Sequence, residues 1–342
     1  MGRVSRPRRI AVLAHPHCLP PDDFDSLPYG EKLKYRTEAN VLAALQRLGH
    51  RVQVVALEDE VTPLRNAVRE FRPHIAFNLI EEFHGSAVYD QNVVSYLELL
   101  RVPYTGCNPR GMVIARDKAL SKKILRYHHL PAPHFAVFRR RRTIRPSPRL
   151  QYPLIVKSLT EDASAGIAEA SVVHSDDKLI ERVEFVHENL GTHAIAEEYI
   201  DGRELYVGVL GRTRLTVLPT WEVSMENLRP DAPRILTLRA KFDARFQDEH
   251  SLLIGPAEDF TEEQERRMAG LARRIYRALG LSGYARLDFR LDARGQPFFI
   301  EANPNPDIAA DAEFAHSAEA AGYSYQRLIQ RIVALGLRSL EG

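Results

Sequence analysis

Residues 283–306 read GYARLDFRLDARGQPFFIEANPNP and predict a β-hairpin. Two apolar segments with alternating polar residues flank a turn from Asp292 to Gly295, which is the pattern of antiparallel strands joined by a short loop. Pairing across that turn brings Asp288 close to Glu301. Because two neighbouring carboxylates repel each other unless a cation lies between them, the hairpin predicts a cation site.

Two further polar side chains share this face, because the side chains of a strand alternate between its two faces. Asn303 lies two residues beyond Glu301, and Arg286 lies two residues before Asp288. Three oxygen-bearing side chains suit Mg²⁺, which takes its remaining ligands from water and phosphate. A fixed guanidinium beside the metal suits a phosphoryl group or a developing oxyanion. This segment alone also fits a surface cluster of salt bridges.

A second polar cluster begins in the segment YPLIVKS at 152–158. Its apolar run predicts a buried strand, and Lys157 near its end would be costly to bury without an anion. The loop TEDASAGI at 160–167 follows, and its small residues let backbone N–H groups approach phosphates. These small residues are Ser164, Ala165 and Gly166. The loop contains no GK[ST] and is therefore not a Walker loop.

The segment AIAEEYIDGRE at 194–204 predicts a strand that turns at Asp201 and Gly202. Three carboxylates lie around it, those of Glu197, Glu198 and Glu204. Carboxylates here can accept hydrogen bonds from the base or the ribose of a nucleotide. Solvated surface charges are the alternative interpretation.

The first third of the chain predicts a parallel sheet with helices on its faces, because apolar strands alternate there with helical patterns. Strands are expected at 8–14, 51–57 and 73–80, and helices at 31–50, 62–71 and 91–100. After residue 111 the order changes to an α+β arrangement. Helices are expected at 115–130, 176–190 and 261–280, and strands at 133–138, 152–158, 168–174, 194–200, 203–210 and 213–223, with a polar stretch to about 258 and a helical end broken at Gly322.

Length and composition exclude several classes of protein. The chain has 342 residues, of which 44% are hydrophobic and 27% charged, as in soluble globular proteins of two or three domains. No apolar run approaches the ~18 residues of a membrane span. Two cysteines form no disulfide framework, and a net charge of +2 argues against a dedicated nucleic-acid binder. We expect a cytoplasmic protein with neither nucleic acid nor membrane as partner.

The order of the motifs carries a family resemblance. Lys118 in RDKALSKK, Lys157, the segment 194–204 and the hairpin follow one another along the chain. Together they resemble the ATP-grasp superfamily, specifically the D-alanine–D-alanine ligase-like proteins. The stretches FNLIEEFHG, LELLRVPYTGCNP and AEAAGYSYQRLIQRIV are similar to that group as well, so the resemblance spans nearly the whole chain.

The resemblance implies a mixed α/β fold of three domains, with ATP held between the central and C-terminal domains. The expected domains are an N-terminal Rossmann-like domain (1–110), a central ATP-grasp lid subdomain (111–204) and a C-terminal subdomain with the metal and catalytic residues (205–342). The implied activity is an ATP-dependent carboxylate-amine ligase. It forms an acyl phosphate, which an amine then attacks as phosphate leaves.

The resemblance also implies a role for individual residues. Phosphate contacts are implied for Lys118 and Lys157, below a loop of Ser164, Ala165 and Gly166. Adenine contacts are implied for Glu197 and the backbone of Glu198 to Ile200, and ribose contacts for Glu204. The implied metal ligands are Asp288, Glu301 and Asn303, which would hold Mg²⁺ and would also suit Mn²⁺. The implied catalytic residues are Lys157, Lys241 in LRAKFD, which would reach the γ-phosphate, and Arg286, which would stabilise the tetrahedral intermediate.

The sequence departs from the D-alanine-specific pattern where the amino acids would bind. The glutamate that holds the first substrate's ammonium has no clear counterpart, although Asp22, Asp23, Asp25 or Glu31 of the remodelled loop could replace it. Residues that carry hydroxyls or glycine in the family are here Ala163, Phe242, Asp307 and Ala312. Asp307 is expected to place a negative charge near the acceptor carboxylate. We therefore expect D-alanyl-D-alanine to be a poor product.

Two other functions are compatible with the same motifs. An ATP-grasp small-molecule kinase would stop at phosphoryl transfer to a hydroxyl group, and a non-catalytic module would only bind nucleotide. The metal set together with Arg286 favours the ligase, because pure binding needs neither. The substrates are expected to be a small-molecule carboxylate and an amine, and the sequence leaves open whether the chain forms a homodimer.

Overall fold

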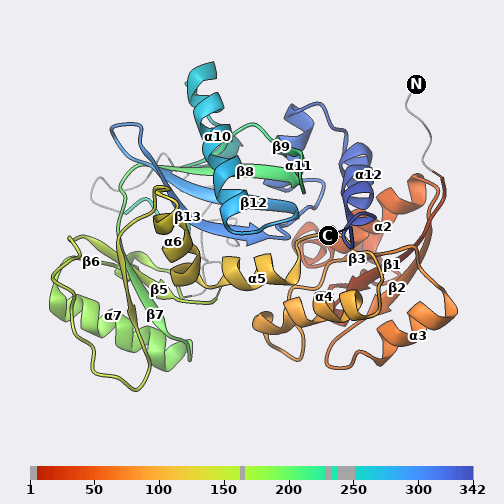
Figure 1. Ribbon diagram of the computed structural model, residues 1–342, viewed down its shortest axis with the longest axis horizontal. Helices are drawn as coiled ribbons and strands as arrows, with labels where there is room; N and C mark the ends of the chain where they lie inside the picture. Colours follow the sequence, from red (N-terminus) through yellow and green to blue (C-terminus); the bar gives the residue numbers. More distant parts are fainter. Residues whose placement is uncertain (1–5, 162–165, 226, 228–232, 238–250, 342) are drawn as a thin grey trace.

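The computed structural model describes residues 6–161, 166–225, 227, 233–237 and 251–341. The strands of these residues form three sheets. Figure 1 shows the N-terminal sheet in red and the central sheet in green on opposite sides of the molecule. Helix α5 (Pro109–Arg116) runs between these two parts, and the strands of the third sheet, in green to blue, lie above it.

The N-terminal sheet is parallel and has the strand order β2-β1-β3. Its strands are β1 (Arg9–Ala14), β2 (Arg51–Ala56) and β3 (Ile75–Asn78). Ile10 and Val12 of β1 pack on one face against α2 and α12, whereas Ala11 and Leu13 pack on the other against α3 and α4. The bounds of these helices are Arg36–Arg47 for α2, Thr62–Glu70 for α3, Asp90–Leu99 for α4 and Tyr325–Gly336 for α12. Helices on both faces explain why β1 is apolar throughout.

The helix expected over 31–50 is wrong as a single element. The chain forms a short helix α1 (Tyr29–Lys32), and α2 begins only at Arg36. The helix expected over 115–130 is likewise divided. The Asp117 carboxylate accepts hydrogen bonds from the amides of Ala119 and Leu120, at 2.9 and 2.8 Å. Asp117 therefore caps a new helix, α6 (Lys118–Tyr127), and Lys118 becomes its first residue.

The central sheet is antiparallel and has the order β4-β7-β5-β6. Its strands are β4 (Phe135–Phe138), β5 (Leu154–Ser158), β6 (Val172–Val173) and β7 (Ala194–Glu198), and α7 (Asp176–Asn189) covers one face. Leu154 and Val156 of β5 pack against α7. Because side chains alternate along a strand, Ile155 and Lys157 face the other way, into a pocket.

The third sheet is antiparallel, with the order β11-β10-β8-β12-β13 and with β9 paired to β8. Its strands are β8 (Arg203–Gly211), β9 (Leu215–Val217), β10 (Trp221–Met225), β11 (Leu252–Pro256), β12 (Gly283–Leu291) and β13 (Pro297–Pro304). Helices α10 (Glu262–Ala278) and α11 (Glu313–Ala320) complete this part. The strand expected over 213–223 is thus two strands, separated at Pro219, which has no N–H for a ladder. Strand β11 lies in the stretch expected to be only polar.

The predicted hairpin is confirmed as β12 and β13. Asp288 lies opposite Glu301, and Arg286 lies opposite Asn303 in the ladder. Strand β12 also pairs with β8 along its whole length, from Gly283 to Leu291. Asp288 therefore lies on a strand that is paired on both sides, and Glu301 and Asn303 lie on its neighbour β13 rather than on a loop.

The chain passes from the central sheet to the third sheet at Gly202. This residue has φ = +148°, and a Cβ atom built on it would lie 2.0 Å from the carbonyl oxygen of Leu291. Glycine is therefore required where β7 leads into β8.

Among the described residues, no helix has both the length and the apolar character to cross a membrane.

Candidate functional site

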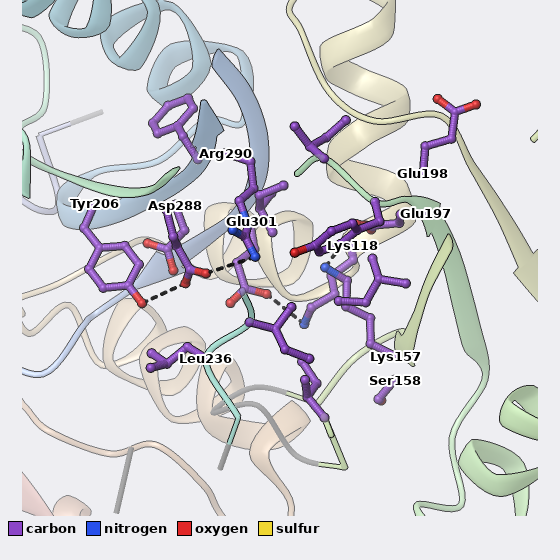
Figure 2. A pocket seen from close by; sticks show the side chains of 18 of the residues that line it. Lys118, Lys157, Ser158, Glu197, Glu198, Tyr206, Leu236, Asp288, Arg290 and Glu301 are labelled. Carbon is purple, nitrogen blue, oxygen red and sulfur yellow. Dashed lines mark hydrogen bonds and ion pairs between the residues drawn. The ribbon is translucent and has the colours of Figure 1, made fainter. Parts of the chain in front are cut away.

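A pocket lies between the central sheet and the strands β8, β12 and β13, and it contains most of the predicted nucleotide residues (Figure 2). The polar residues predicted from the sequence that line it are Lys118, Lys157, Glu197, Glu198, Glu204, Asp288 and Glu301. Much of the remaining wall is apolar and consists of Ile155, Ile167, Ile200, Ile235, Leu236, Phe289 and Ile300. A pocket lined by both apolar and charged side chains suits a flat base joined to a charged tail.

Glu197 lies at the centre of a buried ion cluster. Its two oxygens are 2.9 Å from Nζ of Lys122 and 3.0 Å from Nζ of Lys157. Burial alone would raise the pKa of Glu197, but the two lysines outweigh this effect and hold the pKa below its usual value. Burial lowers the pKa of Lys122 to about 8, and Lys157 adds to the decrease against the attraction of Glu197. The carboxylate predicted to meet adenine therefore also orients a predicted phosphate ligand.

Lys118 occupies the first turn of α6, where the helix dipole disfavours a cation. The structure compensates for this with two acceptors. Nζ of Lys118 donates to the carbonyl oxygen of Glu161 at 2.8 Å and lies 3.4 Å from Glu301. Lys118 thus connects the start of the predicted phosphate loop to the predicted metal site.

Asp288, which lies opposite Glu301, also binds both members of the neighbouring pair, Arg286 and Asn303. Arg286 donates to both of its oxygens, at 2.8 and 3.0 Å, and Asn303 donates to it at 2.9 Å. Arg286 also binds Glu313 of α11 and stacks over the ring of Tyr206, 4.3 Å from its centroid. Burial raises the pKa of Asp288 to about 6, with Glu301 contributing to the increase and Arg286 opposing it.

The donor set of the hairpin fits Mg²⁺. Asp288 and Glu301 are opposite each other on the ladder, and the carbonyl oxygen of the Asn303 side chain is a third hard ligand once its amide nitrogen binds Asp288. Among the described residues, His, Cys, Asp and Glu side chains form no group of three that could hold a metal ion alone. A site of two carboxylates and one amide therefore suits a cation that keeps waters and takes phosphate oxygens.

The carboxylates expected to bind the nucleoside lie in different surroundings. Glu204 accepts a hydrogen bond from Tyr206 at 3.0 Å and lies 3.6 Å from Arg290. The side chain of Glu198 points away from the other labelled groups (Figure 2) and accepts from the amide of Gln151 at 3.2 Å. Only the backbone of Glu198 is therefore suited to the base, as the resemblance implies.

Three predicted residues, Ser164, Ala165 and Lys241, lie outside the described residues. Gly166 is described, and its carbonyl oxygen accepts a hydrogen bond from Arg182 of α7. Arg182 also donates to the hydroxyl group of Ser171 at 2.8 Å. The end of the predicted phosphate loop is thereby fixed to the helix that covers the central sheet.

Three charged residues in or near the site were not predicted from the sequence: Lys122, Glu38 and Glu313. Lys122 had an available signal, because it lies four residues after Lys118 and residues so spaced share a helix face. Glu38 also had one, since it interrupts the buried stripe formed by Val41 and Leu45. Glu313 had no local signal, because it reaches Arg286 from a helix 27 residues away.

The structure describes two of the four residues expected to disfavour D-alanine, Asp307 and Ala312. Asp307 binds Arg36 at 2.7 Å and the hydroxyl of Thr37 at 2.8 Å, and Arg36 also lies 3.4 Å from Asp311. The negative charge expected near an acceptor carboxylate stays a prediction. Ala312 is buried, and Ala163 and Phe242 lie outside the described residues. The candidate replacements Asp22, Asp23, Asp25 and Glu31 are exposed, whereas Glu38 of α2 is buried.

Replacing Glu38 with glutamine should stabilise the protein at pH 8 and have little effect at pH 4. Burial raises the pKa of Glu38 from 4.5 to about 7, and the neighbouring Glu81 and Asp307 add to the increase. The folded protein therefore binds this proton more tightly than the unfolded chain, so stability is lost as the pH rises through about 7. We expect Glu38→Gln to raise the free energy of unfolding at pH 8 by about 2 kcal/mol. Urea titrations of both proteins at the two pH values measure this, and an equal difference at both would contradict the assignment.

The fold and the pocket define a class of protein, the ATP-grasp enzymes. The solved structure of the D-alanine–D-alanine ligase from Bacillus anthracis complexed with ATP matches with a TM-score of 0.76 and 24% identity, over 98% of this chain and 99% of that one. The sequence model of the D-ala D-ala ligase C-terminus matches residues 124–334. The chain therefore belongs to the D-alanine–D-alanine ligase family.

Two curated relatives are similar to most of the chain. An uncharacterized protein, y4sG of Sinorhizobium fredii, is 33% identical over 90% of this chain and 89% of its own length. The D-alanine–D-alanine ligase of Bordetella petrii is 32% identical over 73% of each chain. The predicted enzyme class is thereby confirmed: the chain is an ATP-dependent ligase that forms a C–N bond of the peptide type.

Proposed function

We propose that this enzyme joins an amino acid or a related carboxylate to an amine through an acyl phosphate, with release of ADP and phosphate. The observation that carries the proposal is the convergence of Lys118, Lys157, Asp288 and Glu301 on one pocket with an apolar wall. The lysines supply positive charge for phosphates, and the carboxylates supply ligands for a cation. We further propose that the reaction takes place in the cytoplasm and that the domain boundaries lie near residues 110 and 204.

Each polar group in the pocket has a role that follows from its position. Lys118 and Lys157 neutralise the phosphates, and Glu204 accepts hydrogen bonds from the ribose. Asp288, Glu301 and Asn303 would hold Mg²⁺, which when bound screens the charge of the phosphate oxygens. Arg286 is fixed by Asp288 and Glu313, so its guanidinium is preorganised for the charge that develops on the reacting carbonyl.

The first test is a screen for ATP-dependent condensation. The purified protein is mixed with ATP, Mg²⁺ and pools of D- and L-amino acids and hydroxy acids, and release of ADP and phosphate is measured. Mass spectrometry of the active pools then identifies the product. A condensed product supports the ligase, a phosphorylated product would support the kinase instead, and ATP binding without ADP release would support a binding module.

D-alanine alone should be a poor substrate in this screen. The family's ammonium-binding glutamate has no clear counterpart in sequence, and Ala312 lacks the hydroxyl that would bind the acceptor carboxylate. Each buried polar group left unpaired costs ~1 to 3 kcal/mol, and more when it is charged. We expect steady-state kinetics to show no saturation by D-alanine in the low millimolar range. Robust formation of the dipeptide at those concentrations would contradict this prediction.

A further inference from the structure

The ion cluster at Glu197 contains one more lysine than it needs for charge balance. Lys122 and Lys157 bind different oxygens of the same carboxylate, and all three side chains are almost inaccessible to solvent, at 0%, 6% and 1% exposure for Lys122, Lys157 and Glu197. Two buried cations around one anion are unfavourable without a further anion. These three side chains alone therefore lack one negative charge. Glu301 also acts on Lys122 through its charge, but it lies 3.4 Å from Lys118.

The two lysines are held differently. Lys157 lines the pocket, and among the described residues its Nζ has Glu197 as its partner. Lys122 does not line the pocket. It also donates to the carbonyl oxygen of Ile300 in β13, and its Nζ lies 5.7 Å from the ring centroid of Phe299. Lys122 is fixed on the protein side, and Lys157 faces the ligand side.

This asymmetry determines what can happen when a phosphate enters. If Lys157 moved from Glu197 to the phosphate and no other cation were present, a buried carboxylate would lose its only counter-ion, which is costly. With Lys122 in place, Glu197 keeps one ion pair after Lys157 leaves. The excess positive charge of the cluster is then offset once the phosphate is bound, because the phosphate supplies the missing negative charge.

We propose that Lys122 is a positioning residue that acts as the permanent counter-ion of Glu197 and thereby releases Lys157 to bind the phosphates of ATP. The inference rests on the proposed function, since it takes Lys157 to be a phosphate ligand. It assigns to Lys122 an effect on nucleotide affinity that is exerted entirely through a neighbouring carboxylate.

The test is a double-mutant cycle on ATP affinity, measured by calorimetry. Lys122→Met removes the charge and keeps most of the side-chain length, and we expect it to raise the Kd for ATP by about tenfold or more, because Glu197 then retains Lys157. In a Glu197→Gln background the same substitution should change Kd by less than about twofold, because no carboxylate remains to hold Lys157. Lys123→Met, at the exposed neighbouring lysine, is the matched control and should not change Kd.

Each result has a definite meaning. A loss of equal size in both backgrounds would overturn the proposal and assign Lys122 a purely structural role through Ile300. If Lys122→Met alone does not fold, Glu197→Gln with and without Lys122→Met still gives the decisive comparison, because equal Kd values support the proposal and a tenfold difference overturns it. Wild-type protein that binds no ATP would contradict the proposed function itself, whereas wild-type binding unaffected by Lys122→Met would contradict only this inference.

Discussion

Replacing Arg286 with alanine should lower kcat by ~10²- to 10³-fold while ATP still binds, the usual effect of losing one preorganised electrostatic contact. Arg286 does not line the nucleotide pocket, but it binds Asp288, which does. The proposed role of the guanidinium is therefore to act on the reacting groups rather than to bind the nucleotide. Lys157→Ala should differ, because Lys157 lines the pocket and its loss should weaken ATP affinity as well.

Two controls separate the contribution of Arg286 to catalysis from its contribution to folding. Arg286→Ala leaves Asp288 and Glu313 without their shared cation, so thermal melts should show lower stability. Arg286→Lys keeps the charge but cannot bind both carboxylates with the same planar geometry. We expect it to be more stable than Arg286→Ala but to keep a low kcat. Calorimetric ATP titrations complete the comparison. An equal loss of ATP binding in Arg286→Ala and Lys157→Ala would contradict the division of roles.

Replacing Glu301 with glutamine should raise the Mg²⁺ concentration needed for half-maximal turnover by at least ~10- to 100-fold, since even the outer contacts of metal sites have effects of this size. Glutamine keeps the volume and an oxygen acceptor for Lys118, 3.4 Å away, but removes one negative charge opposite Asp288. The substitution should therefore affect metal binding more than folding.

The measurement is a set of turnover rates across a Mg²⁺ titration, with thermal melts of the same samples. Glu263→Gln, at an exposed glutamate of α10, is the matched control and should behave as the wild type. Unchanged turnover of a well-folded Glu301→Gln protein at every Mg²⁺ concentration would remove Glu301 from the proposed metal site.

The hairpin was predictable because its geometry is local. A short turn fixes the register of two strands, and the register fixes which side chains face one another. The positions of Arg286, Asp288, Glu301 and Asn303 relative to one another follow from these two rules, and the structure confirms the pairs. Their roles in metal binding and catalysis stay predictions, as do those of Ser164, Ala165 and Lys241.

The long-range partners were not predictable from pattern alone. Asp307 was expected to place a negative charge near the acceptor carboxylate, and the sequence did not show that Arg36, 271 positions earlier, binds it where α2 meets the segment after β13. Lys122 could not be predicted for a related reason. The sequence shows its helix face, but not that Glu197 of β7 and Ile300 of β13 contact that face. Burial creates such pairs only after the sheets have packed.

The passage through Gly202 limits how this enzyme can be recombined with its relatives. The residues proposed to hold the base immediately precede the glycine and the one proposed to hold the sugar follows it, so one nucleotide site is shared between two sheets over a few residues of chain. A chimera joined near residue 204 would take the two halves of that site from different parents. A chimera joined at the end of β8 instead would take both halves of the site from one parent. Strand β8 would then pair with a β12 from the other parent. If these roles hold, specificity for the nucleotide is inherited as a unit that crosses the proposed domain boundary.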